Sequence, residues 1–211
     1  ARWFWQQSLQ AVELVDERVK KHQIACDWQR GYATVAIRPQ HWEELQQWHE
    51  HARQHYGATH YQLWDKATLK QQLASDMYLG AQFDPHSGHL HPLNYTLGIA
   101  RAAAEAGAQI FEQSPMTRIE PYQGGWLVHT PDGSIECQNL VYAVNTYAGL
   151  HQKFKPLEKK AIAVSTFIIA TEPLGERAKE LICNNMAVCD NRHVLDYYRL
   201  SADGRLLFGG K

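Results

Sequence analysis

The feature that most constrains the fold is a short joint at Gly107, between a clear helix and an apolar segment. Residues 92–106 open with Pro92, which the first turn of a helix tolerates, and continue with small and apolar residues at helical spacing. Residues 108–112 follow at once and are typical of a strand. A helix joined so tightly to a strand is half of a βαβ unit. The sequence therefore predicts an α/β part with parallel strands here.

Three strand-sized pieces come next, at residues 116–122, 126–130 and 134–138. Gly124-Gly125 and Pro131-Asp132-Gly133 separate them, and such pairs favour tight turns because glycine accepts positive φ and proline presets φ. A three-stranded meander is predicted. The apolar run at residues 140–144 is typical of a buried parallel strand.

Outside this region the patterns predict strands with helices between them. Apolar residues at helical spacing indicate a helix near the start of the chain, from Trp5 to Val19, and a second one opening at Pro39 and ending at Gly57. Asp65 is a candidate N-cap for a short helix. Strands are expected at residues 31–37, 81–90, 163–171, 186–190, 194–200 and 205–208, a helix at 175–182 and a hairpin turn at Asp203-Gly204.

Composition bounds the class of protein. A net charge of −1 and the lack of a basic run give no sign of a nucleic acid or membrane partner. No apolar run approaches the roughly 20 residues that span a bilayer. The four cysteines lack Cys-x-x-Cys spacing, which favours free thiols in a reducing cytoplasm, with a Cys183–Cys189 disulfide as the alternative.

Several segments, taken in their order, resemble the D-amino-acid oxidase-like family of flavoproteins, which includes glycine and sarcosine oxidases. They are Val19-Lys-Lys-His-Gln-Ile-Ala-Cys-Asp27, Gly88-His-Leu-His-Pro-Leu-Asn-Tyr95, Ala143-Val-Asn-Thr-Tyr147, Ile169-Ala-Thr-Glu-Pro-Leu174 and Asp196-Tyr-Tyr-Arg-Leu-Ser201. The resemblance covers essentially the whole chain. It implies α/β plus α+β architecture: a partial Rossmann-like FAD-binding domain with a three-stranded meander, and a substrate domain built on an antiparallel sheet.

The resemblance also implies how the chain divides. Residues 1–22 would be a helix of the FAD-binding part, 23–86 the first part of the substrate domain, 87–150 the second half of the FAD-binding domain, and 151–211 the rest of the substrate domain. The Gly-x-Gly-x-x-Gly fingerprint that holds a dinucleotide pyrophosphate does not occur in this sequence. We therefore expect an internal fragment of a longer enzyme, which by itself is a poor binder of FAD and inactive.

By resemblance, two segments contact FAD. Met116 and Thr117 would place main-chain groups against the adenine; the alternative is an ordinary meander strand. The second segment ends the predicted parallel strand, where ligands of such sheets bind. It consists of Ala143, Val144, Asn145 and Thr146. Here the alternative is a strand-to-helix turn with Asn145 or Thr146 as N-cap, and both can hold together.

By resemblance again, the strand carrying Tyr197, Tyr198 and Arg199 lines the substrate cavity. Alternation puts Tyr197 and Arg199 on one face and Tyr198 on the other. Arginine with tyrosine can bind a substrate carboxylate, although an edge-strand arginine in water fits the sequence equally well. His89 is a further candidate to face the substrate or flavin. His86, His89 and His91 could suggest a metal, but no complete ligand set accompanies them, and we expect a loop leading into the helix at Pro92.

The resemblance implies an FAD-dependent oxidoreductase. It would take hydride from a carbon bearing an amine, release an imine for hydrolysis, and be reoxidised by oxygen. An amine or amino-acid-like substrate is expected, and a gamma-glutamyl polyamine, as in polyamine catabolism, is the specific candidate. No catalytic residue is assigned. Exposed sheet edges of a fragment would favour self-association. The alternative is a non-catalytic domain that binds a small ligand or partner and has no redox role.

Overall fold

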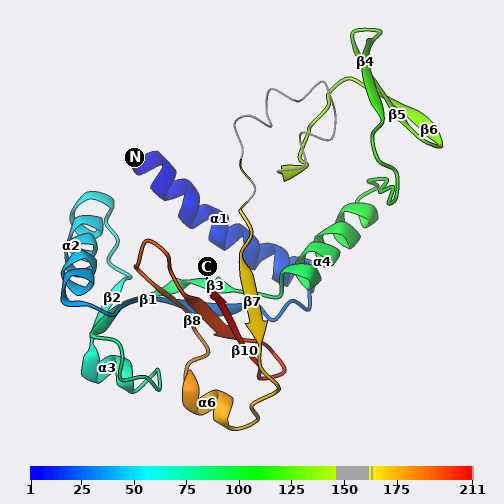
Figure 1. The fold of residues 1–211 in the computed structure, drawn as a ribbon. Coiled ribbons are helices and arrows are strands. Elements are labelled where there is room, and N and C mark those ends of the chain that lie inside the picture. The colour runs from blue at the N-terminus through cyan, green and yellow to red at the C-terminus, as the bar shows by residue number, and fades with distance from the viewer. Residues whose placement is uncertain (146–161, 163, 211) are drawn as a thin grey trace. The chain divides into compact units, whose positions relative to one another are not determined.

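The computed structural model describes residues 1–145, 162 and 164–210. They form two compact units, Ala1–Gly107 with Thr166–Lys211, and Ala108–Ser165. The larger unit is built on a seven-stranded sheet and the smaller one on a three-stranded sheet (Figure 1). The mixed α/β class is confirmed. These units do not test the predicted division into four segments, which stays a prediction.

The large sheet has the strand order β2-β3-β1-β8-β9-β10-β7. Every adjacent pair is antiparallel except β1 with β8, so the predicted antiparallel sheet is confirmed with one parallel exception. β2 was not predicted, because Gln62–Asp65 is a short edge strand without clear alternation. The strands are β1 (Gln29–Ala36), β2 (Gln62–Asp65), β3 (Gly80–His89), β7 (Phe167–Ala170), β8 (Ala187–Asp190), β9 (Tyr197–Leu200) and β10 (Leu206–Gly210).

The helices of the larger unit begin and end where local chemistry predicts. α2 opens at Pro39 and stops at Gly57, whose left-handed φ of 69° suits glycine. Asp65 caps α3 by accepting a hydrogen bond from the Thr68 amide at 2.8 Å. The ranges are α1 (Arg2–Lys21), α2 (Pro39–Tyr56), α3 (Lys66–Lys70), α4 (Pro92–Glu105) and α6 (Arg177–Leu181).

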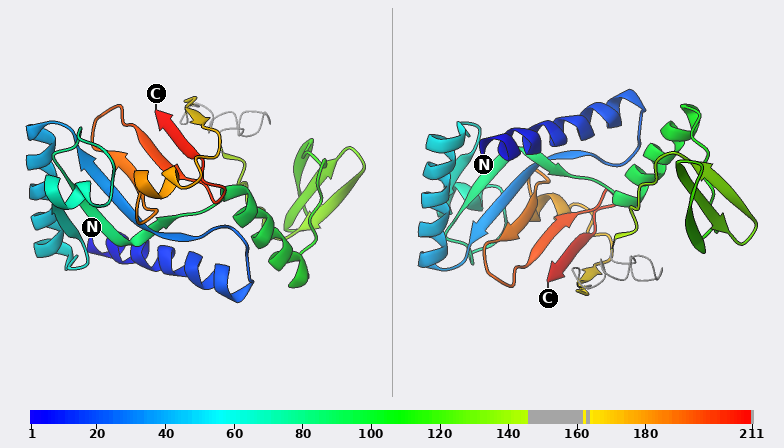
Figure 2. Two further views of the ribbon diagram at one scale, coloured as in Figure 1. Left: turned by 90° about the horizontal axis from the view of Figure 1, so that it is seen from below. Right: turned by 90° about the horizontal axis from the view of Figure 1, so that it is seen from above.

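One face of the large sheet carries the hydrophobic core. Alternate strand residues point to this face, and side chains of α3 and α6 complete it; Figure 1 shows both helices below the sheet. We call it the core face. Figures 1 and 2 show α2 at one end of β1 and β3, where Leu45 and Ala52 are buried. Buried members of the core are Ala33, Val35, Leu69, Leu73, Tyr78, Ala81, Ala178, Ile182, Met186, Val188 and Leu200.

α4 forms as predicted, but its surroundings differ from the prediction. The predicted βαβ unit would pack this helix on a sheet, whereas Leu93 and Leu97 are 59% and 57% exposed. The helix instead presents Gly98 to Ile24, where an added Cβ would lie 2.9 Å from Ile24 Cγ1. Helical periodicity reveals an apolar face and does not say which segment covers it.

The smaller unit contains the predicted meander as β4 (Arg118–Tyr122), β5 (Gly125–Thr130) and β6 (Gly133–Cys137). The predictions of strands at residues 108–112 and 140–144 are wrong, since both segments are irregular. Phe111 and Val141 are 62% and 85% exposed. A strand exists only through hydrogen bonds to a neighbour, and no described segment pairs with either one.

All four cysteines are free thiols, as favoured from the sequence, so the alternative disulfide is wrong. Among the described residues, no helix is both long and apolar enough to cross a bilayer.

Candidate functional site

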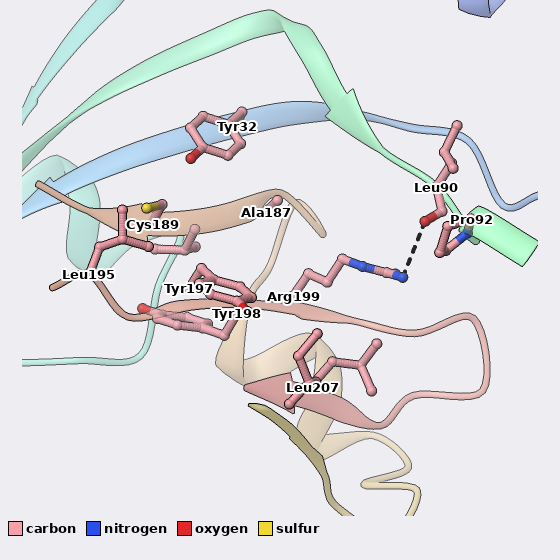
Figure 3. Close-up of a pocket in the computed structure, with 12 residues that line it drawn as sticks. Tyr32, Leu90, Pro92, Ala187, Cys189, Leu195, Tyr197, Tyr198, Arg199 and Leu207 are labelled. Atoms are coloured by element: carbon pink, nitrogen blue, oxygen red, sulfur yellow. Dashed lines mark hydrogen bonds between the residues drawn. The ribbon is translucent and has the colours of Figure 1, made fainter. Parts of the chain in front are cut away.

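The second face of the large sheet bears a cavity of about 500 Å³ (Figure 3). We call this side the cavity face. Cross-strand pairs align its residues in rows, because directly opposed residues point to the same side of a sheet. Cys189 pairs with Tyr197, and Tyr197 with Gly209; Arg199 pairs with Leu207. The cavity is lined by Tyr32, Leu90, Pro92, Ile168, Ala187, Val188, Cys189, Leu195, Tyr197, Tyr198, Arg199 and Leu207.

Arg199 brings the one positive charge to this lining. Its Nη1 donates to the Leu200 carbonyl at 3.1 Å and its Nη2 to the Leu90 carbonyl at 3.2 Å; Figure 3 shows the guanidinium reaching toward Leu90. Burial lowers the pKa of Arg199, and the charge of Asp27 opposes that shift. Among the described residues, no carboxylate lies within ion-pair distance of Arg199. The guanidinium therefore keeps donors for an anion that enters the cavity.

The two tyrosines beside Arg199 divide between the faces, as strand alternation predicts. Tyr198 belongs to the core face, where its hydroxyl donates to the Tyr78 hydroxyl at 2.9 Å and its ring stacks on Phe208. Tyr197 shares the cavity face with Arg199 through its pairing. Burial raises the pKa of Tyr198, so its hydroxyl stays protonated. Tyr197 and Arg199 are thus the pair that can meet a ligand.

Tyr32 on β1 and Cys189 on β8 supply further polar atoms to the lining, and neither was predicted from the sequence. Burial raises the pKa of each group, so the phenol and the thiol are neutral. The Cys189 thiol donates to the Asp190 carbonyl at 3.1 Å. Only the pairing of β1 with β8 and of β8 with β9 brings these residues to the cavity. Those pairings join segments far apart in sequence.

Ion pairs of Arg192 with Asp190 and Asp196 hold the turn between β8 and β9, which carries Leu195 of the cavity lining. Asp190 is buried and accepts from the Arg192 amide at 2.9 Å and from Arg192 Nε at 2.8 Å. Arg192 also pairs with Asp196. Burial tends to raise the pKa of Asp190, but the hydrogen bonds from Arg192 outweigh it and the net shift is downward. The carboxylate therefore stays charged and the turn stays closed.

His89 is not among the residues that line the cavity. Its Nε2 lies 2.8 Å from the Asn185 carbonyl, so Nε2 carries the proton, and its buried Nδ1 has no hydrogen-bond partner among the residues that the structure describes. Burial lowers the pKa of His89; the Asn185 bond opposes this and the charge of Arg199 adds to it. A contact between His89 and substrate stays a prediction.

The other two histidines of that segment have structural places. His91 Nδ1 accepts from the Asn94 amide at 3.3 Å and so caps α4, in line with the expected loop into Pro92. The ring of His86 stacks on His60. Over the described ranges, no three potential ligands gather as a metal site would require.

The residues predicted to contact FAD lie in the smaller unit. Thr117 precedes β4. Its amide and its hydroxyl both donate hydrogen bonds to the His129 carbonyl, at 2.8 and 3.1 Å. Ala143, Val144 and Asn145 are exposed and irregular, with Asn145 at a left-handed φ of 54°. Met116 is half-buried, and Thr146 lies outside the described residues. No hydrogen bond or strand pairing among described residues joins the two segments, and their contact with FAD stays a prediction.

A family model for FAD-dependent oxidoreductases, the DAO family, matches residues 1–211. The chain belongs to the DAO family. It is 44% identical over 212 residues to the probable oxidoreductase OrdL of Haemophilus influenzae, covering 99% of this chain and 49% of that protein. It is 36% identical to the gamma-glutamylputrescine oxidoreductase of Escherichia coli, covering 100% and 49%. The chain thus spans about half the length of these DAO relatives.

Solved structures show the same DAO fold. A glycine oxidase from Bacillus cereus superposes with a TM-score of 0.75 at 17% identity, covering 97% of this chain and 55% of that one. An L-proline dehydrogenase from P. horikoshii gives 0.75 at 19% identity, with 94% and 53% covered. At such identities the likeness shows the fold alone.

Proposed function

We propose that this chain is the substrate-binding part of an FAD-dependent oxidoreductase that oxidises an amine. Membership of the DAO family supports the reaction class. The specific candidate substrate is gamma-glutamylputrescine, supported by the 36% identity to the oxidoreductase named for it. In the complete protein the flavin supplies the electron acceptor, and the residues of the cavity face bind and orient the substrate.

The observation that carries the proposal is Arg199 in the cavity. A partly buried cation with no carboxylate in reach among the described residues is costly unless a ligand supplies the charge. The glutamyl group of gamma-glutamylputrescine ends in a carboxylate, which an arginine binds by two charge-assisted hydrogen bonds. Apolar side chains along the wall, such as Leu207 and Ile168, suit the methylene groups of a polyamine.

The hydroxyl of Tyr197 is assigned to the same ligand as a second polar contact. Tyr197 and Arg199 are two positions apart, which places them about 7 Å from each other along β9. A substrate anchored at Arg199 can therefore reach Tyr197 only with a chain several atoms long. Tyr198 and His89 support this wall from behind, Tyr198 through Tyr78 and His89 through the Asn185 carbonyl.

The remaining assignments rest on the family resemblance. Met116, Thr117 and residues 143–146 are proposed to contact FAD only when further chain completes the site, and residues 1–211 alone are expected to stay colourless after incubation with FAD and desalting. A cytoplasmic location is proposed from the free cysteines, and self-association from the exposed apolar side chains of edge strand β7.

The test is anaerobic titration of the complete flavin-loaded protein with gamma-glutamylputrescine, followed by the flavin absorption band. Bleaching that saturates with substrate is expected, and re-admitted oxygen should restore the band with formation of peroxide. Free putrescine, which lacks the carboxylate, should bleach the flavin only at much higher concentration. If no amine bleaches the band while ligands still bind, the non-catalytic alternative holds.

A further inference from the structure

The floor of the cavity contains a glycine that its backbone does not require. Gly209 is buried in β10, opposite Tyr197 on β9 and Ile168 on β7. It is not among the glycines with positive φ, so any residue could adopt its backbone conformation. The reason for glycine at this position must therefore be steric.

The steric reason is the ring of Tyr197. A Cβ built on Gly209 would overlap Cε2 and Cζ of that ring and lie 2.7 Å from its hydroxyl oxygen. The ring therefore lies flat across β10, in space that any other residue at position 209 would fill. Because the sheet backbone lies beneath it, a ring pushed off Gly209 moves toward the open side, which is the cavity.

Gly209 is the one member of its row without a side chain. On β8, β9, β10 and β7 the row consists of Cys189, Tyr197, Gly209 and Ile168. The next row on the cavity face contains Arg199 and Leu207, about 7 Å further along the strands. A ligand anchored at Arg199 and longer than that spacing has to pass over the Tyr197 ring. The height of the ring therefore limits ligand length.

We propose that the Tyr197–Gly209 pair is a specificity determinant that keeps the cavity open to elongated carboxylates. The inference deepens the proposed function and rests on it for the identity of the substrate. The ligand class is a chain of several methylenes, carrying a carboxylate at Arg199 and extending across the lowered ring. A short amino acid, which ends before the Tyr197 row, does not depend on the pair.

The first experiment measures binding without turnover. The complete protein is titrated calorimetrically with acetate, butanoate and hexanoate, in the wild type and in Gly209→Ala. In the wild type each methylene that is buried should raise affinity roughly fourfold. In Gly209→Ala acetate should bind as before, whereas the gain from butanoate to hexanoate should disappear.

Gly210→Ala is the matched control. It adds the same methyl group to the neighbouring residue of β10, which faces the other side of the strand, where the Cβ would lie 2.7 Å from Asp196 Oδ1 and 4.0 Å from the Leu195 carbonyl oxygen. Its alkanoate series should match the wild type. The double variant Tyr197→Ala with Gly209→Ala removes the displaced ring, and hexanoate affinity should return.

The outcomes separate this inference from the proposed function. Equal alkanoate series in wild type, Gly209→Ala and Gly210→Ala would overturn the inference even if amines bleach the flavin. If Gly209→Ala loses the affinity gain from butanoate to hexanoate, but no amine bleaches the flavin, the role of the Tyr197–Gly209 pair is supported. The proposed amine oxidation is then rejected. If Gly209→Ala does not fold, Tyr197→Ala alone decides, because it should extend the length of alkanoate accepted, and an unchanged series overturns the inference.

Discussion

The two faces of the large sheet are built from the same strands and do different work. On the core face, Val188, Leu200 and Met186 are almost completely buried and belong to the hydrophobic core. On the cavity face, alternate positions carry a phenol, a thiol and an unpaired guanidinium around an open volume. Consecutive residues Tyr198 and Arg199 thus belong to different environments. A single strand can supply both stability and a binding wall, because its side chains alternate.

This division predicts that substitutions on the two faces have separable effects. Changes on the core face should lower the free energy of unfolding and leave ligand affinity unchanged in the protein that remains folded. Changes on the cavity face should lower ligand affinity and leave the free energy of unfolding nearly unchanged. The comparison fails if a cavity-face substitution is as destabilising as a core-face one.

The largest expected effect is on the core face. Ile182 is 1% exposed and packs between α6 and the sheet. Ile182→Ala should lower the free energy of unfolding of the complete protein by about 2–5 kcal/mol, because it removes buried methylenes and leaves a cavity. Urea denaturation measures this. Ile168→Ala, at an apolar position 60% exposed, is the control and should change stability by less than about 0.5 kcal/mol.

The largest effect on the cavity face is expected at Arg199. Arg199→Gln removes the charge that meets the substrate carboxylate, and the KM for gamma-glutamylputrescine should rise about 10- to 100-fold. Arg199→Lys keeps the positive charge but loses the two parallel N–H donors of the guanidinium. Its KM should lie between those of the wild type and Arg199→Gln. Steady-state oxidation rates at varied substrate concentration measure this.

Arg205→Gln is the matched control for that series, because Arg205 pairs with Asp203 at the turn after β9, and it does not line the cavity. Its KM should equal that of the wild type. Equal KM values for Arg199→Gln and Arg205→Gln would show that Arg199 does not meet the substrate.

The same comparison explains what the sequence could and could not predict. Elements defined by nearby residues were predicted correctly, such as α2 with its terminal Gly57 and the meander with its glycine turns. Strands at residues 108–112 and 140–144 were predicted from apolar content alone. They are absent because no described segment provides the partner that a strand needs.

The candidate site was predictable to the same degree. Alternation within β9 was enough to separate Tyr198 from Tyr197 and Arg199. Tyr32 and Cys189 could not be found, because their places depend on β1 pairing with β8, which lies more than 150 residues away in the chain. Which face of a strand is buried is a property of its partners. A local pattern gives the alternation and leaves the choice of face open.

A smaller effect is expected from the hydroxyl pair under β9. Tyr198→Phe leaves the buried Tyr78 hydroxyl without its partner, and should lower the free energy of unfolding by about 1–2 kcal/mol. Tyr78→Phe with Tyr198→Phe removes both polar groups and should recover part of the loss. Ligand affinity should be unchanged in both. A double-mutant cycle by urea denaturation measures the coupling, and a loss of affinity in Tyr198→Phe would show that the Tyr198 hydroxyl contributes to ligand binding.

The smallest expected effect is on the pH dependence of stability, and it arises from two partly buried histidines, His60 and His89. Burial lowers the pKa of His89 and of His60 below the ordinary value of 6.5. The unfolded chain therefore binds protons at these rings at a higher pH than the folded chain does. Their contribution to stability is fully present above pH 6.5 and is lost as the pH falls through that value toward the folded pKa.

Urea denaturation between pH 7.5 and 5.5 isolates this contribution. The free energy of unfolding should decrease as the pH falls, by at most about 1.4 kcal/mol per pH unit for each histidine. Asp16, whose pKa is lowered, keeps its full stabilisation over this pH range, because that stabilisation is lost only as the pH falls below 3.8. In His89→Gln, whose amide can still donate to the Asn185 carbonyl, the slope should flatten. A slope equal to that of the wild type would mean that His89 titrates alike in the folded and the unfolded protein.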